Sequence, residues 1–438
     1  MKSYNSIGVQ SPKILLPDQH VNPYTWAVIA CDQYTSQPEY WQQVEELVGN
    51  APSTLRMILP EAYLEKPDET ARIVRTQQTM QNYLENDIFI SHDGFILVER
   101  TVNGRTRTGL MLALDLERYD FSAGSQSLIR ATEGTILDRL PPRMRIREGA
   151  PLEIPHILVL IDDPSCTVIE PLVEYRTRLK KLYDFDLMFD SGHLTGYAVS
   201  DPAMEKGVVR ALEKLTDPNT FYSRYGVSSD KGILLFAVGD GNHSLATAKS
   251  IWEKIKGAVG MNHPARFALV EIENLHDDAL EFEPIHRVMF GVKQPIIPAL
   301  QKAFGENINV EKIQSYDDLT SLVKTPTPAV QRTGMVQGNS CFLLSIQNAE
   351  HNLPVGTLQA FLDRWLKEGN AERIDYVHGA DVLHELGSQE GCIGFFVPAI
   401  QKSDLFKTVI VDGVLPRKTF SMGEAREKRF YMESKRIS

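Results

Sequence analysis

The stretch Gly232-Ile-Leu-Leu-Phe-Ala-Val-Gly-Asp-Gly-Asn-His-Ser244 indicates the fold of this chain more clearly than any other. Residues 232–238 are uniformly apolar, as in a strand that is buried on both faces of a sheet. After residue 244, apolar side chains recur at spacings of three, four and three, which predicts a helix that ends at Gly257. Another strand is expected at 266–271. The stretch therefore predicts a β-loop-α-β unit within a mixed α/β protein.

Hydrophobic periodicity and turn residues predict further helices and strands on both sides of this unit. At 438 residues the chain is too long for one ordinary core, so we expect two or three domains of mixed sheets with flanking helices. Their expected limits are 1–150, 151–290 and 291–438. Asn103-Gly104 is a strong hairpin-turn signal between two of the strands. Strands are expected at 26–30, 89–90, 94–99, 108–116, 157–161, 195–199 and 393–397, and helices at 38–48, 69–84, 173–183, 203–215, 404–411 and the charged C-terminal end.

Composition limits the classes of partner. The net charge of -11 and the pI near 5.6 argue against broad nucleic-acid binding, because the phosphate backbone would be repelled. No apolar run approaches the ~20 residues of a membrane span, and nothing resembles a signal peptide. Four scattered cysteines form neither a metal-binding nor a disulfide pattern. We expect a cytoplasmic protein that binds a small-molecule substrate or phosphorylated metabolite, and the sequence is compatible with a homodimer.

The turn after the apolar strand has the features of an anion site, because glycines precede the N-terminus of a helix. Asp240 could bind Mg²⁺ as a metal ligand or act as a catalytic base, and His243 could hold phosphate or transfer a proton. In the alternative interpretation this is only a tight turn with Asn242 as helix cap. The residues assigned here to phosphate or cofactor binding are Gly239, Gly241, Asn242 and Ser244.

Residues 130–147 carry five arginines in an otherwise acidic chain. Arginine binds phosphates and carboxylates in bidentate fashion, so Arg130 and Arg139 are candidates for cofactor binding. Glu133 lies among these arginines and could be a general base that its neighbours keep ionised. The alternative is a solvated charged surface without a ligand.

Two later motifs could bring more cations to the same anion. Glu283-Pro-Ile-His-Arg287 supplies His286 and Arg287, and Leu415-Pro-Arg-Lys-Thr-Phe-Ser421 supplies Arg417 and Lys418. The alternatives are a structural loop histidine and plain surface. Cys31-Asp-Gln-Tyr34 has no histidine partner nearby in the sequence, which weakens the hypothesis of a nucleophilic cysteine.

Several of these motifs resemble, in order and over nearly the whole chain, the domain-of-unknown-function family 1015 of bacteria and archaea. Beside the three motifs around Asp240, His286 and Arg417, the resemblance includes Trp26-Ala-Val-Ile-Ala-Cys-Asp-Gln-Tyr-Thr35, Pro52-Ser-Thr-Leu-Arg56 and Arg130-Ala-Thr-Glu-Gly-Thr135.

The resemblance also implies a ligand. Many members read Asp-Gly-His-His-Arg where this chain has Asp240-Gly-Asn-His-Ser244. That version is similar to a nucleotide-phosphate motif of the ParB/sulfiredoxin-like superfamily, which includes free-serine kinases, and members are often encoded beside serine-biosynthesis genes. The implied cofactor is ATP or another nucleotide with Mg²⁺. Because Ser244 replaces the arginine, Arg139, Arg287 or Arg417 would have to supply the missing phosphate contact.

The leading hypothesis is a nucleotide-dependent phosphotransferase, or another phosphate-handling enzyme, that acts on a small hydroxylated metabolite such as serine. Phosphoryl transfer depends mainly on positioning and charge stabilisation, which these residue types can supply. The rival hypothesis is a non-catalytic regulator that senses a metabolite. A dinucleotide-dependent enzyme is disfavoured, because Ser244 stands where the fingerprint has its third glycine and no acidic residue follows at about twenty positions.

Overall fold

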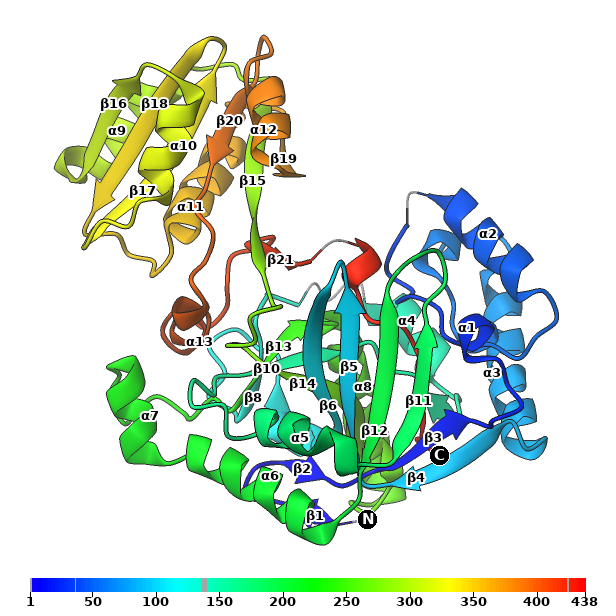
Figure 1. Ribbon diagram of the computed structural model, residues 1–438. Coiled ribbons are helices and arrows are strands. Elements are labelled where there is room, and N and C mark those ends of the chain that lie inside the picture. The colour runs from blue at the N-terminus through cyan, green and yellow to red at the C-terminus, as the bar shows by residue number, and fades with distance from the viewer. Residues whose placement is uncertain (1, 36, 136–139, 424) are drawn as a thin grey trace. The chain divides into compact units, whose positions relative to one another are not determined.

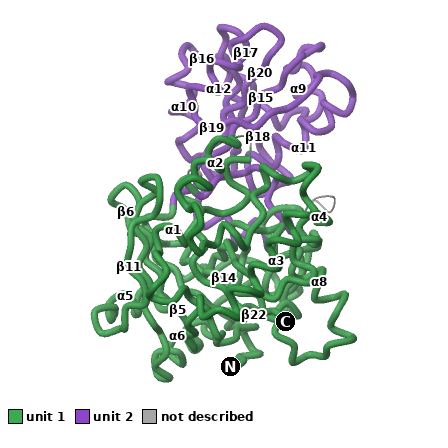
Figure 2. Tube along the Cα trace, turned by 90° about the vertical axis from the view of Figure 1, so that its right-hand side faces the viewer, with its two compact units in different colours: residues 1–280, 423–438 green, residues 281–422 purple. Residues whose placement is uncertain are grey.

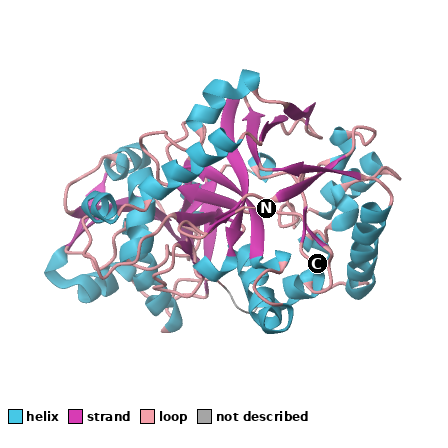
Figure 3. Ribbon diagram, turned by 90° about the horizontal axis from the view of Figure 1, so that it is seen from below, coloured by secondary structure: helices cyan, strands magenta, loops and turns pink. Residues whose placement is uncertain are grey.

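The computed structural model describes residues 2–35, 37–135, 140–423 and 425–438 (Figure 1). The chain forms two compact units: unit 1 contains Met1–Leu280 and Gly423–Ser438, and unit 2 contains Glu281–Met422 (Figure 2). Helices and strands occur together throughout the described chain (Figure 3), as the predicted mixed α/β class requires. The division differs from the three expected segments, because strands on both sides of residue 150 belong to one sheet in unit 1.

An eleven-stranded mixed sheet forms the centre of unit 1, in the order β11-β12-β5-β6-β14-β10-β13-β8-β7, with β2 beside β6 and β1 beside β2. The pairs β10–β14, β13–β8 and β7–β8 are parallel, and the others are antiparallel. The strands are β1 (Ser3–Tyr4), β2 (Val9–Gln10), β5 (Phe95–Val102), β6 (Arg105–Asp115), β7 (Tyr119–Asp120), β8 (Ile129–Ala131), β10 (Leu158–Ile161), β11 (Lys181–Asp186), β12 (His193–Val199), β13 (Phe236–Asp240) and β14 (Phe267–Asn274). Two small pairs are β3 (Lys13–Pro17) with β4 (Phe89–Asp93) and β9 (Leu152–Glu153) with β22 (Lys435–Arg436).

Both faces of this sheet are covered, because alternate side chains of a strand point to opposite faces. Leu110 and Leu112 belong to the apolar core that includes Trp252, whereas Met111 between them belongs to the core that includes Trp26 and Trp41. The helices of unit 1 are α1 (Pro23–Trp26), α2 (Pro38–Val48), α3 (Glu69–Glu85), α4 (Leu140–Arg147), α5 (Glu170–Tyr175), α6 (Pro202–Leu215), α7 (Pro218–Tyr225) and α8 (Asn242–Val259).

The predicted β-loop-α-β unit is present as β13, α8 and β14. β13 covers only the second half of the apolar run, and α8 continues two residues past Gly257 and is capped by Gly260. β13 and β14 are not neighbours, because β10 lies between them, antiparallel to the first and parallel to the second.

The C-terminal strap, residues 426–438, returns to unit 1 after unit 2. Its central residues Phe430, Tyr431 and Met432 are all buried. The indole N–H of Trp26 donates to the Met432 carbonyl at 3.1 Å. The predicted helix here is wrong: a 3-10 turn (Ala425–Glu427) leads into extended chain. Three consecutive buried side chains suit an extended strap better than a helix with one apolar face.

Two other predicted elements differ from the structure. The strand expected at 26–30 is buried, but α1 ends at Trp26 and only Ile29 forms a bridge, to Phe430. The helix expected at 173–183 is wrong beyond its beginning, because Lys181 starts strand β11. The hairpin at Asn103-Gly104 is confirmed, with both residues at positive φ.

Unit 2 contains an antiparallel sheet in the order β16-β18-β17-β20-β15-β19, with β21 beside β15. Its strands are β15 (Phe282–Phe290), β16 (Ile308–Ile313), β17 (Val330–Gln337), β18 (Ser340–Gln347), β19 (Arg373–His378), β20 (Ile393–Phe396) and β21 (Phe420–Met422). Its helices are α9 (Ile296–Phe304), α10 (Tyr316–Lys324), α11 (Pro354–Lys367), α12 (Ala380–Gly387) and α13 (Lys402–Val411). Across the part of the chain that the structure describes, no helix has the length and apolar character to cross a membrane.

Candidate functional site

The turn between β13 and α8 depends on Gly241. This residue has φ +78°, and a Cβ atom at its position would lie 3.0 Å from the Ile157 Cα. A side chain is therefore excluded by conformation and by space. Within the described residues no side chain caps α8, and its first backbone hydrogen bond runs from the Leu245 amide to the Gly241 carbonyl at 3.0 Å. The positive end of the helix dipole thus faces the turn, and it favours a negative charge there.

Asp240, the last residue of β13, pairs with Lys428 of the strap. The Lys428 Nζ donates to one carboxylate oxygen at 3.1 Å, and the Gly241 amide donates to the other at 2.9 Å. Burial by itself raises the pKa of Asp240, but Lys428, His156 and these hydrogen bonds outweigh it and hold the pKa below its usual value. Asp240 is therefore a carboxylate at neutral pH.

His156 connects this turn to two other segments. Its Nδ1 lies 2.8 Å from the Tyr431 hydroxyl, and its Nε2 lies 3.2 Å from the Ser244 hydroxyl. The same Nε2 is 3.8 Å from an Asp32 carboxylate oxygen. His156 precedes β10 in the sequence, so the structure supplies the histidine that the Cys31–Tyr34 motif lacks locally.

The thiol of Cys31 does not become a nucleophile in this setting. Burial, and then the nearby carboxylates of Asp32 and Glu61, raise its pKa to about 12. The thiolate that attacks electrophiles is therefore absent near neutral pH. Burial also raises the pKa of Glu61, although its ion pair with Arg143 opposes the shift.

Glu133 lies in the segment that follows β8, and this segment adjoins the turn. The Thr132 amide donates to the Asn242 side-chain oxygen at 3.3 Å, and the Thr132 hydroxyl donates to the Val238 carbonyl at 2.6 Å. Both Glu133 and His243 are half-buried. The structure thus brings together two of the motifs that the sequence singles out.

The arginine-rich stretch is mostly engaged with protein groups. Arg130 is 1% exposed and donates to the backbone carbonyls of Ser127 and Gly232, which removes its guanidinium from a ligand. Arg139 lies outside the described residues. The last three arginines form ion pairs that attach α4 to the rest of unit 1: Arg143 with Glu61, Arg145 with Glu69 and Arg147 with Glu153.

The remaining predicted cations belong to unit 2, whereas the turn belongs to unit 1. His286 is buried and stacks on Phe396, and burial lowers its pKa to about 4. Arg287 is fully buried and donates to the Gln359 side chain and to the Arg417 carbonyl, both at 3.0 Å. The Arg417 guanidinium forms an ion pair with Asp363 at 2.5 Å. Lys418, beside it, is exposed.

The residues around Asp240 do not form a metal site by themselves. Among the described residues, no three histidine, cysteine or carboxylate side chains gather as metal ligands. One oxygen of Asp240 already accepts from Lys428, whose positive charge opposes a cation at that position. Asp240 is thus arranged as the partner of a lysine and not, among the described residues, as one of several metal ligands.

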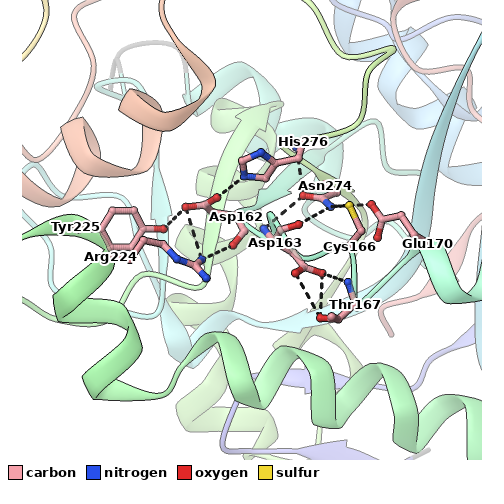
Figure 4. A network of polar contacts seen from close by, with 9 residues as sticks. All are labelled: Asp162, Asp163, Cys166, Thr167, Glu170, Arg224, Tyr225, Asn274 and His276. Atoms are coloured by element: carbon pink, nitrogen blue, oxygen red, sulfur yellow. Dashed lines mark hydrogen bonds and ion pairs between the residues drawn. The ribbon is translucent and has the colours of Figure 1, made fainter.

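A second polar network lies at the other end of β10 (Figure 4). Asp240 pairs with Leu158 at the start of that strand, and Asp162 follows its end. The His276 ring lies 2.6 Å from one Asp162 oxygen, and the Tyr225 hydroxyl donates to the other. Arg224 donates to the Asp162 carbonyl at 2.7 Å. Protein groups thus satisfy both oxygens of this carboxylate.

Asp163 in the same network is also satisfied by protein groups. It accepts from the backbone amides of Thr167 at 2.6 Å and Val168 at 2.9 Å. The side-chain amide of the buried Asn274 donates to the Asp163 carbonyl at 2.9 Å and to Glu170 at 2.7 Å. These contacts tie together the loops after β10 and β14, so we assign this network a structural role.

The fold is that of a mixed α/β protein, and the candidate site combines the N-terminus of α8, which no described side chain caps, with a lysine–aspartate pair. The chain belongs to the DUF1015 family of proteins of unknown function, whose model matches residues 13–365. No curated protein matches it.

Similar solved structures are distant. A mutant free serine kinase in complex with AMP has a TM-score of 0.39 and 11% identity over 74% of this chain and 91% of its own. A conserved hypothetical protein from Pyrococcus furiosus has a TM-score of 0.33 and 11% identity over 74% and 90%. C-terminally truncated SbnI from Staphylococcus aureus has a TM-score of 0.34 and 11% identity over 74% and 82%. At these TM-scores the likeness carries no argument about the site.

Proposed function

We propose that unit 1 binds the phosphate groups of a nucleotide at the first turn of α8 and transfers a phosphoryl group to a small hydroxylated metabolite such as serine. One observation carries the proposal: α8 begins, without a side-chain cap among the described residues, beside Lys428 and His156. A helix N-terminus with an adjacent cation is the arrangement that binds phosphate in many proteins.

In the proposed reaction the substrate hydroxyl oxygen forms a bond to the terminal phosphorus, and the bond from phosphorus to the nucleotide oxygen breaks. The leaving oxygen keeps that electron pair, and Lys428 with the positive end of the α8 dipole stabilises its negative charge. The hydroxyl proton passes to a carboxylate. Glu133 and Asp32 are the candidates, since one adjoins the turn and the other lies beside His156.

The first experiment is isothermal titration of the full chain with ADP, ATP, AMP, CTP and inorganic phosphate. Lys428→Met should weaken nucleotide binding roughly 10- to 100-fold, because a charge-assisted hydrogen bond contributes about 1.5–3 kcal/mol. The matched control is Lys256→Met near the other end of α8, about 21 Å from Asn242 for fourteen residues of helix. It should bind like the wild type. If no nucleotide binds, or if Lys428→Met binds unchanged, the proposal is wrong.

Transfer is then followed by phosphorus NMR with ATP or ADP and serine. Asp240→Asn keeps the shape of the site but removes the charge that pairs with Lys428. Without that charge Lys428 is no longer oriented toward the leaving oxygen, so this variant should lose turnover, while the lysine still attracts the nucleotide. Nucleotide binding by the wild type without transfer to any hydroxyl would favour the metabolite-sensing regulator over the enzyme.

A further inference from the structure

Lys428 reaches the candidate site from the strap, so its position depends on what holds the strap there. The strap residues that follow Lys428 are held by many contacts, among them the hydrogen bond from the Ala30 amide to the Arg429 carbonyl at 2.9 Å. On the other side of Lys428 the chain leads directly to unit 2, which ends at Met422.

Arg100 of β5 holds the backbone on that side. One terminal nitrogen of its guanidinium donates to the Lys428 carbonyl at 2.7 Å, and the other donates to the Arg426 carbonyl, also at 2.7 Å. The guanidinium also lies over the Phe430 ring, 4.9 Å from its centre. Three residues of the strap are thus held by one side chain.

The environment of Arg100 is unusual for a side chain with only a packing role. It is 4% exposed, and its partners are carbonyls of the strap and of Ser191, while its Nε bonds to no described acceptor. Burying a guanidinium is costly, so a shorter apolar side chain would fill this place in the core at lower cost. What the guanidinium adds is a fork that fixes two carbonyls at a set spacing.

We propose that Arg100 is a positioning residue that acts through Lys428: it fixes the strap backbone so that the lysine side chain points to Asp240 and to the bound anion. The inference rests on the proposed phosphate-binding function. It also predicts that the charge alone is not enough, because the single ammonium nitrogen of a lysine at position 100 lacks the rigid fork that holds two carbonyls at a set spacing.

The test is a double-mutant cycle with Arg100→Lys and Lys428→Met, read by the Kd of ADP. Arg100→Lys alone should weaken ADP binding about tenfold, the loss expected when a hydrogen bond to a charged group is removed. In the Lys428→Met background, Arg100→Lys should cause no further loss, because the residue through which it acts is already gone. Arg266→Lys is the matched control, since that guanidinium binds Asp115 and the Met261 carbonyl.

The possible failures are distinguishable. If Lys428→Met binds ADP like the wild type, the proposed function has failed. If only Arg100→Lys binds like the wild type, or if it weakens binding equally in both backgrounds, the positioning role is overturned. Should Arg100→Lys fail to fold, as judged by circular dichroism, Arg100→Ala is measured with added guanidinium. If guanidinium restores ADP binding to Arg100→Ala, the proposal is supported. If guanidinium restores the fold of Arg100→Ala but not its ADP binding, the proposal is overturned.

Discussion

Gly241 and Gly257 lie at the start and near the end of α8, and the same substitution should have opposite effects at the two positions. At Gly241, alanine would have to adopt a left-handed conformation, at about 1–2 kcal/mol, and its Cβ would lie 3.0 Å from the Ile157 Cα. Backbone atoms cannot move aside as a side chain can. We expect Gly241→Ala to lower the free energy of unfolding of unit 1 by roughly 2–3 kcal/mol in total.

At Gly257 the expected sign is reversed. This glycine is helical and exposed, and a Cβ atom there would meet no atom within 4 Å. Alanine restricts the unfolded chain and suits a helix interior, so Gly257→Ala should raise the free energy of unfolding by about 0.5–1 kcal/mol. The free energies of unfolding of the two variants should therefore differ by about 3 kcal/mol, although each variant adds only one methyl group to the wild type.

Urea unfolding followed by tryptophan fluorescence measures this difference. Trp26, Trp41 and Trp252 lie in unit 1, and Trp252 is part of α8 itself, so the signal reports mainly on that unit. A loss below about 0.5 kcal/mol for Gly241→Ala would refute the argument from backbone conformation. An equal loss of unfolding free energy in both variants would show that α8 tolerates no added methyl group at either position. That result would also refute the argument from backbone conformation.

Three further predictions concern buried groups. Burial raises the pKa of Glu273 from 4.5 to about 8, although its ion pair with Arg107 opposes the shift. The folded protein therefore holds a proton that the unfolded chain releases, and stability should fall by roughly 1 kcal/mol per pH unit between about pH 5 and 8. Glu273→Gln should flatten this slope, measured as urea midpoints at pH 5.5 and 7.5; an unchanged slope would contradict the assignment. Burial lowers the pKa of His286 from 6.5 to about 4, so proton NMR should show a neutral ring at pH 5.5. The stability that the neutral ring contributes is present above pH 6.5 and is lost as the pH falls towards 4. A titration midpoint near 6.5 would exclude this. Gly109→Ala would place a Cβ atom 2.2 Å from a Glu271 carboxylate oxygen and 2.7 Å from the Glu271 Cγ. In the same urea assay this variant should lower the free energy of unfolding by about 3 kcal/mol. The control Gly104→Ser, at the open hairpin turn, should lower it less.

The local elements were predictable where the sequence has strong periodicity or turn chemistry. The helices at 38–48 and 69–84, the hairpin at Asn103-Gly104 and the strand before Asp240 follow from such signals. The start of β11 at Lys181 was missed, because its alternating pattern adjoins an apparently helical one. Strand neighbours were not predictable, since the insertion of β10 between β13 and β14 depends on contacts that no local pattern records.

The candidate site was predictable only where it is contiguous in sequence. The glycine turn at Asp240 is a local signal, and the structure places the Thr132 segment beside it. His156 was missed because it belongs to no recognisable motif and simply precedes an apolar strand. Lys428 was missed because the charges of its segment suggested a helix. A run of three large apolar residues after Lys428 was the signal that this segment is buried.

The return of the strap also has a consequence for biosynthesis. The ribosome must make the 142 residues from 281 to 422 before the strap exists, which takes about 7–28 s at roughly 5–20 residues per second. Until then Glu271 lacks its partner Arg429 and Glu153 lacks its partner Lys435, although all four side chains are buried in the finished protein. The nascent first unit therefore lacks one cation beside each of these two carboxylates, although Arg147 already pairs with Glu153. Truncation of the last thirteen residues would remove both cations permanently, and it should therefore destabilise unit 1.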